Sequence, residues 1–233
     1  MRPALGLAPA AALAWHAAPA LTARGPLRAR IGGPGRPGGV ALTFDDGPHP
    51  EGTPAVLQEL ATLGWTATFF LLGSQVRRHP GLAAAVVAAG HEVAVHGDEH
   101  RNHLAHGPAW AAADLGRAAA AITGATAVRP RWFRPPYGVL TGGTLRAARR
   151  RSLTPVLWTA WGRDWEPSTP ERVVEHLRPG LRSGAILLLH DGVGTGAPDA
   201  WRTTAAALPL LATELARRGL AVRPLRDHLR SPR

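Results

Sequence analysis

The chain has 233 residues and no cysteine, so it can form one domain with a full hydrophobic core but neither disulfide bonds nor thiolate metal sites. The formal net charge is +11, and all 27 lysine-or-arginine positions are arginine. This charge favours anionic surroundings such as nucleic acid or an anionic cell-wall polymer. The arginines are scattered rather than gathered in a stripe, which argues against a nucleic-acid partner.

Residues 1–38 form a predicted N-terminal arm rich in Ala, Pro, Gly and Arg, and a folded domain is expected over residues 39–233. An apolar run over residues 4–21 follows Arg2, but two prolines and a histidine interrupt it. It is therefore too broken to predict a transmembrane helix of roughly 20 apolar residues. Two interpretations stay open. The arm is a weak signal peptide or membrane anchor over residues 1–22, or it is an Ala-rich helix or disordered segment leading into a linker.

Short apolar runs alternate with helical stretches through the rest of the chain. The expected strands are 40–42, 67–72, 92–95, 155–158, 185–189 and 220–222, and the expected helices are 54–63, 80–89, 108–123, 145–151, 169–179 and 201–218. This alternation implies parallel strands with right-handed crossovers. We expect an α/β fold, a distorted or incomplete (β/α) barrel of about seven parallel strands. An open doubly wound sheet is the alternative, but no Gly-rich phosphate loop supports it.

The stretch Thr43–Pro48 ends the first strand. Asp45 and Asp46 are adjacent carboxylates, and Gly47 and Pro48 then turn the backbone. Neighbouring side chains point in opposite directions along extended chain, so the two carboxylates can serve different purposes. We expect one to bind a metal ion and the other to handle a proton. A surface turn with two solvated acids is the alternative, which turn statistics favour for this stretch alone.

Two histidines follow the strand over residues 92–95. His96 and His100 lie four residues apart, so on one helical turn they would face the same side and could chelate one ion. His103 is a candidate for supporting that site, and Asp46 would complete the ligand set with a position left for water. Zinc is the default ion, with cobalt, nickel and iron as alternatives. A polar loop with solvated histidines is the other interpretation.

A proline-rich segment, residues 134–138, comes next. Its two prolines fix the backbone, so the amide of Tyr137 can be held at a set angle as a donor to an oxyanion. Arg134 can pair with Asp45 and keep that carboxylate charged and oriented. A proline-rich loop with Tyr137 packed on the core is the alternative.

His190 ends the apolar strand over residues 185–189, a place where histidine is more often a hydrogen-bonded core residue. Asp164 could orient it as an acid, because a carboxylate fixes the tautomer and charge of an imidazole. Three tryptophans surround Asp164 in the sequence, as core residues or as a platform for a sugar ring: Trp158, Trp161 and Trp165.

These segments, in this order, resemble the five motifs of the polysaccharide deacetylases, carbohydrate esterase family 4. The resemblance covers about residues 38–228. It implies that Asp45 is the catalytic base and that the domain after the arm is the catalytic domain. It also implies a set of three metal ligands: Asp46, His96 and His100.

The later motifs complete the resemblance. They imply that Arg134 orients the base, that the amide of Tyr137 lies in the oxyanion hole, and that Asp164 supports His190 as the acid. They also assign two substrate-binding residues besides Tyr137: Trp165 in the groove and Leu188 at the pocket for the acetyl methyl group.

Two positions depart from the family pattern. Gly97 stands where Ser or Thr is usual, and Trp161 stands where the fourth motif often begins with Asp. Neither departure removes an expected ligand, base or acid.

The predicted function is a metal-dependent hydrolase that removes N-linked acetyl groups from amino sugars of a peptidoglycan- or chitin-like polymer or a glycoconjugate. One alternative is a deacylase or deformylase acting on another acylated sugar, such as a lipid-linked one. The other is a non-catalytic carbohydrate-binding relative. The expected substrate slightly favours a secreted, membrane-associated or cell-wall-associated protein.

Overall fold

The computed structural model describes residues 15–18, 31, 35–192 and 196–229. Its strands are β1 (Gly39–Asp45), β2 (Thr68–Leu71), β3 (Glu92–Val95), β4 (Trp132–Phe133), β5 (Thr154–Pro155), β6 (Ala160–Trp161), β7 (Ile186–His190) and β8 (Ala221–Arg223). Its α-helices are α2 (Gly52–Leu63), α3 (Gly73–Arg78), α4 (Pro80–Ala88), α5 (Pro108–Thr126), α6 (Gly142–Arg150), α7 (Pro170–Leu177), α8 (Ala200–Arg217) and α9 (Leu225–His228).

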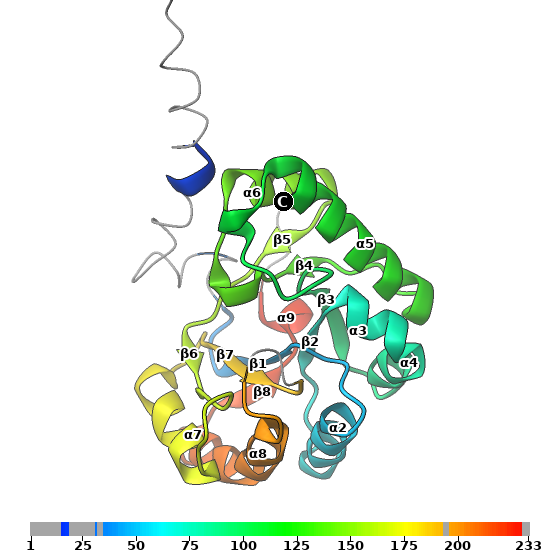
Figure 1. Ribbon diagram of the computed structural model, residues 1–233. Coiled ribbons are helices and arrows are strands. Elements are labelled where there is room, and N and C mark those ends of the chain that lie inside the picture. The colour runs from blue at the N-terminus through cyan, green and yellow to red at the C-terminus, as the bar shows by residue number, and fades with distance from the viewer. Residues whose placement is uncertain (1–14, 19–30, 32–34, 193–195, 230–233) are drawn as a thin grey trace, which may run out of the picture.

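The strands form one sheet in the order β5-β4-β3-β2-β1-β7-β6, with β8 paired to the first residues of β1. Every pairing between these strands is parallel. The larger helices lie around the outside of the sheet (Figure 1). No pairing joins β5 to β6 among the described strands, so the barrel is incomplete, which confirms the predicted fold class.

The central strand β1 brings the candidate residues to one edge. All seven of its residues are buried, as expected for a strand flanked by parallel neighbours and covered on both faces. In the register of the sheet, Asp45 lies beside Phe70 of β2 and beside His190 of β7. Because parallel strands share one carboxyl edge, Asp45 and His190 meet there although 145 positions separate them.

The strand predicted over residues 155–158 is mostly absent. Only the two residues of β5 pair with β4. The carbonyls of Val156 and Leu157 instead accept hydrogen bonds from the guanidinium of Arg134, at 3.3 and 3.5 Å. The buried arginine thus satisfies two carbonyls that no neighbouring strand binds. The chain resumes pairing at β6, which the sequence did not predict.

The start of α2 also differs from the prediction. The helix was expected to begin at residue 54, but it begins two residues earlier, at Gly52, and Glu51 occupies the N-cap without a side-chain hydrogen bond. The Thr53 hydroxyl is buried, accepts a hydrogen bond from the amide of His49 and donates one to the carboxylate of Asp191. The hydroxyl of Thr53 therefore binds the carboxylate of Asp191, which is distant in the sequence, and does not cap the helix. The short helix α3 was likewise not predicted.

Residues 35 and 36 pack on the last described residues, 228 and 229. Gly35 forms an antiparallel bridge with Leu229, and the amide of Arg36 donates to the carbonyl of His228 at 2.8 Å. Most of the predicted arm lies outside the described residues, so the signal or anchor and the boundary after residue 38 stay predictions. Within the described part of the chain, no helix combines the length and apolar character needed to span a membrane.

Candidate active site

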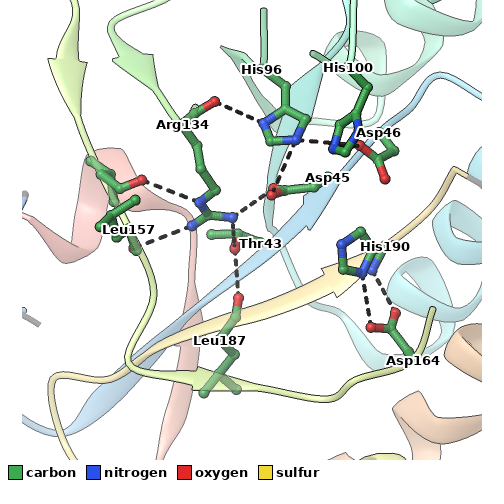
Figure 2. Close-up of polar contacts among 11 residues, drawn as sticks. Thr43, Asp45, Asp46, His96, His100, Arg134, Leu157, Asp164, Leu187 and His190 are labelled. Atoms are coloured by element: carbon green, nitrogen blue, oxygen red, sulfur yellow. Dashed lines mark hydrogen bonds and ion pairs between the residues drawn. The ribbon is translucent and has the colours of Figure 1, made fainter. Parts of the chain in front are cut away.

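A cavity of about 320 Å³ opens at the carboxyl edge of the sheet. Eight of the ten residues proposed from the sequence line it, and the other two, Arg134 and Asp164, lie behind it in contact with lining residues. The lining residues are Asp45, Asp46, His96, His100, Pro135, Tyr137, Gly138, Trp158, Trp161, Trp165, Leu188, His190 and Gly196. Figure 2 shows polar contacts among residues that line the cavity and residues directly behind them.

Asp46, His96 and His100 form a cluster that could hold a metal ion. One ligand atom from each lies within 4.8 Å of the others. Nε2 of each histidine lies 3.4 Å from Oδ1 of Asp46, which is buried and has no hydrogen-bond partner among the described residues. A buried acceptor without a donor, facing two imidazole nitrogens, fits a divalent cation that accepts nitrogen and oxygen ligands.

The backbone explains why Asp45 and Asp46 face the same cavity. The prediction that they point in opposite directions assumed extended chain, and Asp46 instead has φ of 77°, in the left-handed region. The segment just after β7 holds the turn, because the amide of Asp191 donates to the carbonyl of Asp45 at 3.3 Å. Gly192 packs on the backbone of Asp46 so closely that a Cβ there would lie 2.6 Å from its carbonyl carbon. Packing against the segment after β7 thus turns the second carboxylate toward the cavity.

His96 and His100 do not share a helical turn, contrary to the prediction. The segment between them has no helical or strand structure. Nδ1 of His96 lies 2.8 Å from the carbonyl of Arg134, which fixes the tautomer and leaves Nε2 facing Asp46. His103 does not join the cluster, since its Nδ1 contacts the hydroxyl of Thr144 at 3.1 Å and its Nε2 faces Asp114.

A buried carboxylate on α5 holds the loop between the two histidines. Asp114 accepts hydrogen bonds from the amides of Asp98 and Glu99, at 3.1 and 3.4 Å. The carboxylate of Asp98 is in turn bound by Arg77 and Arg117, at 2.6 and 2.7 Å. The sequence analysis missed this support, because nothing local distinguishes a carboxylate within an Ala-rich helix.

We expect Asp114→Ala to weaken Zn²⁺ binding by about 10- to 100-fold, the usual effect of removing a group that orients a metal ligand. The reason is that two amides of the His96–His100 loop would lose their acceptor. The measurement is Zn²⁺ affinity by competition with a chromogenic chelator. Asp114→Asn, which keeps one acceptor, should lose less, and Glu175→Ala on the exposed face of α7 is the control. An unchanged affinity in Asp114→Ala would show that the loop holds its shape unaided.

Asp45 is bound to a buried arginine, as predicted. Arg134 Nη1 donates to Oδ1 of Asp45 at 2.7 Å and to the hydroxyl of Thr43 at 2.8 Å, and both charged side chains are almost fully buried (Figure 2). The Thr43 hydroxyl donates to the carbonyl of Leu187. A carboxylate held by its Oδ1 presents Oδ2 to the cavity, 3.7 Å from Nε2 of His96.

His190 faces Asp46 across the cavity and is bound from behind by Asp164. Nδ1 of His190 lies 2.9 Å from Oδ1 of Asp164, and Oδ2 of that carboxylate accepts from the His190 amide and the Thr204 hydroxyl. Burial alone would lower the pKa of His190, but Asp164 outweighs it, with smaller contributions from Asp46 and Asp45, and raises that pKa to about 9. Asp164 therefore favours the protonated imidazole and binds its Nδ1, which leaves Nε2 as the nitrogen that can donate a proton.

Charge also keeps Asp46 ionised. Burial alone would raise its pKa, yet the close contact with His96 and the charges on His100 and His190 hold the pKa well below its usual range. A carboxylate must be ionised to bind a metal ion.

The remaining wall is aromatic and apolar. Leu188 is buried, and Trp165 packs edge-on against His190 with ring centroids 5.3 Å apart. Tyr137 also lines the cavity; it has φ of 59°, and its ring lies 4.5 Å from that of His100. A left-handed tyrosine is uncommon and marks a backbone held by its surroundings, here the turn that the two prolines begin.

Comparison with known proteins identifies the family of the chain. The family model described as polysaccharide deacetylase matches residues 32–156. A chitooligosaccharide deacetylase from Bradyrhizobium sp. is 39% identical over 193 residues, which are 80% of this chain and 88% of the relative. The chain belongs to the polysaccharide deacetylase family. A peptidoglycan-N-acetylglucosamine deacetylase from Bacillus cereus is 35% identical over 188 residues, 77% of this chain and 83% of the relative.

One similar structure shows that the polysaccharide deacetylase fold alone does not decide activity. A carbohydrate esterase family 4 pseudoenzyme from Bacillus anthracis is 26% identical, with a TM-score of 0.76 over 84% of this chain and 67% of its own. A mutant of that pseudoenzyme has restored enzymatic activity. Function in this family therefore has to be argued from the site residues.

The departure at Gly97 has a local cause. Its φ is +94°, where a side chain is strained, and a Cβ would lie 3.0 Å from Oδ2 of Asp114. The carboxylate that binds the following two amides thus takes the space in which a serine or threonine side chain would begin.

Proposed function

We propose that this protein is a metal-dependent hydrolase that removes acetyl groups from the nitrogen of amino sugars in a polysaccharide or glycoconjugate. One observation carries the proposal. The cluster of Asp46, His96 and His100 lines the same cavity as Asp45, which is bound to a buried arginine, and His190, which is bound to a buried carboxylate. Such a pair supplies a proton acceptor and a proton donor to one cavity.

Asp46, His96 and His100 would hold the metal. Two imidazoles and one carboxylate leave a coordination position open and suit Zn²⁺ best, with Co²⁺, Ni²⁺ and Fe²⁺ as other candidates. A cation bound there polarises an amide carbonyl and lowers the pKa of water.

Asp45 then acts as the general base. Its Oδ1 is occupied by Arg134, so Oδ2 takes the proton of the attacking water. The amide of Tyr137 is the donor proposed for the oxyanion of the tetrahedral intermediate. His190 gives its Nε2 proton to the leaving amine and is kept protonated by Asp164 until then. Leu188 borders the space for the acetyl methyl group, Trp165 lines the groove, and no covalent enzyme intermediate is needed.

The test is acetate release from a panel of substrates. We expect acetate from N-acetylglucosamine oligomers or from peptidoglycan, loss of activity with a chelator, and recovery on adding Zn²⁺. Formate or longer acids released from other acylated sugars would favour a deformylase or deacylase. Absence of product from every substrate by the Zn²⁺-loaded protein would favour a non-catalytic carbohydrate-binding relative. Recovery with Co²⁺, Ni²⁺ or Fe²⁺ but not Zn²⁺ would change the assigned metal.

A further inference from the structure

A hollow of about 360 Å³, which we call the arginine hollow, opens at the edge of the sheet where the strands begin. Glu92, the first residue of β3, lines it, and so does Arg131, which directly precedes β4. Two further arginines line it: Arg129 before β4 and Arg226 on α9. Because β3 and β4 run parallel to the other strands, the arginine hollow and the candidate active site lie at opposite edges of the sheet.

Positive charge outweighs negative charge in the arginine hollow. Among the described residues that line it, Glu92 is the one carboxylate. The oxygens of Glu92 already accept from the Thr68 hydroxyl, the Trp132 indole and the amide of Arg226, at 2.8, 2.8 and 2.9 Å. Asp227 lies 3.8 Å from the guanidinium of Arg226, but its side chain is 61% exposed, and water screens such a pair. Three guanidiniums therefore outnumber the nearby carboxylates.

His91 adds a neutral hydrogen-bond donor to the wall of the arginine hollow. It is buried, and its Nδ1 accepts from the amide of Ala67 at 3.2 Å, so its proton is on Nε2. Burial and the charge of Arg226 lower the pKa of His91 to about 4. The charge of the hollow at neutral pH therefore comes from arginines, which stay protonated throughout the physiological range.

A neighbouring hollow, of about 340 Å³, shares Arg129 with the arginine hollow. Arg151 lines it as well, and no carboxylate is among its described lining residues. The guanidinium of Arg151 lies over α5 at Gly116, where a Cβ would be 2.5 Å from Nη2. Nη2 of Arg129 lies 3.5 Å from the carbonyl of Arg151. Two hollows that carry arginines therefore meet at Arg129.

We propose that the two hollows form one binding site for a chain of linked phosphate groups. Arg131 and Arg226 bind one phosphate group in the arginine hollow. Arg151 binds another in the neighbouring hollow, and Arg129 reaches both. A guanidinium presents its donors as a planar fork that matches phosphate oxygens, and such charge-assisted hydrogen bonds are among the strongest in proteins. A phosphate group is tetrahedral, so guanidiniums from different segments can approach it from different directions, which a planar carboxylate does not allow.

The proposed site is independent of the proposed function. Its arginines come from three segments that are distant in the sequence, so the sequence analysis found them scattered. Since the site lies at the edge opposite to the candidate active site, an anionic polymer bound there leaves the substrate cavity open. Such a contact would hold the protein on a phosphate-bearing polymer while the cavity binds its own substrate.

The experiment measures binding of a short glycerol-phosphate oligomer, a chain of phosphodiesters, to the full chain by calorimetry. Inorganic phosphate and a glutamate oligomer of equal charge are the comparison probes. We expect the glycerol-phosphate oligomer to bind at least about 10-fold more tightly than either, because neighbouring groups on one chain occupy both hollows. Arg129→Gln should weaken its binding by about 10-fold or more, the usual effect of losing a charged hydrogen bond.

Further variants separate the fork from the charge. Arg129→Lys keeps the charge without the planar donors and should lose less affinity than Arg129→Gln. Arg226→Gln, on a different segment, should weaken binding as Arg129→Gln does, with a thermal midpoint close to that of the wild type. Arg172→Gln removes the same charge from an exposed position on α7 and should change the affinity by less than about twofold. Acetate release from N-acetylglucosamine oligomers should be the same in Arg129→Gln and the wild type.

Three results would overturn the proposed phosphate site, whether or not the protein releases acetate. Equal weakening in Arg129→Gln and Arg172→Gln would show that net charge alone attracts the oligomer. Binding of the glutamate oligomer as tightly as the glycerol-phosphate oligomer would remove the preference for phosphate. Binding to vesicles containing phosphatidylglycerol that Arg129→Gln abolishes, without binding of the soluble oligomer, would favour a membrane-facing surface instead.

Discussion

Asp45→Asn is expected to lower kcat for deacetylation by about 10²- to 10⁴-fold, the usual contribution of a general base. The amide is nearly isosteric, so its oxygen can still accept the hydrogen bond from Arg134, but it cannot take a proton from water. The measurement is acetate release under saturating substrate, with Zn²⁺ content determined by elemental analysis. Metal content should stay near that of the wild type, because Asp45 is outside the proposed ligand set.

Asp46→Asn provides the contrast, since it should lose metal as well as turnover. Asp227→Asn, on an exposed carboxylate far along the chain, is the control and should change neither quantity. Turnover like that of the wild type in Asp45→Asn would exclude Asp45 as the base. Loss of metal in Asp45→Asn would place this carboxylate among the ligands instead.

Arg134→Met is expected to destabilise the fold by about 3–5 kcal/mol, because it leaves the carboxylate of Asp45 buried without its partner. The side chain of Arg134 is fully buried and is the largest of the fully buried side chains. The substitution also removes the donors that the carbonyls of Val156 and Leu157 use in place of a strand ladder. The measurement is the free energy of unfolding from urea titration at neutral pH.

Rescue separates the charge effect from the packing effect. Asp45→Asn placed in the Arg134→Met background should recover part of the lost stability, since no buried carboxylate then lacks a counter-charge. Arg172→Met, which breaks an exposed ion pair with Glu175, should change the free energy of unfolding by less than about 1 kcal/mol. A loss below about 1 kcal/mol in Arg134→Met would mean that water reaches Asp45.

Local patterns determined the fold class. Apolar runs that end in polar residues predicted most strands, and their alternation with helices predicted the incomplete parallel barrel. The five short motifs also predicted that the candidate residues meet at one edge of the sheet. The reason is that all parallel strands end at the same side of the sheet. Pairings that depend on residue type, such as Arg134 with Asp45 and Asp164 with His190, could also be predicted, since few groups satisfy a buried charge.

Tertiary packing decided what local rules could not. The left-handed backbone that turns Asp46 toward the cavity depends on Gly192, just after β7, packing against it. The loop carrying His96 and His100 takes its shape from Asp114 on α5 rather than from a helical turn. Neither support is visible in the sequence, because spacing describes only neighbours along the chain. The sequence by itself thus determined which chemical groups meet at this edge, whereas contacts between distant segments decided the direction in which each group points.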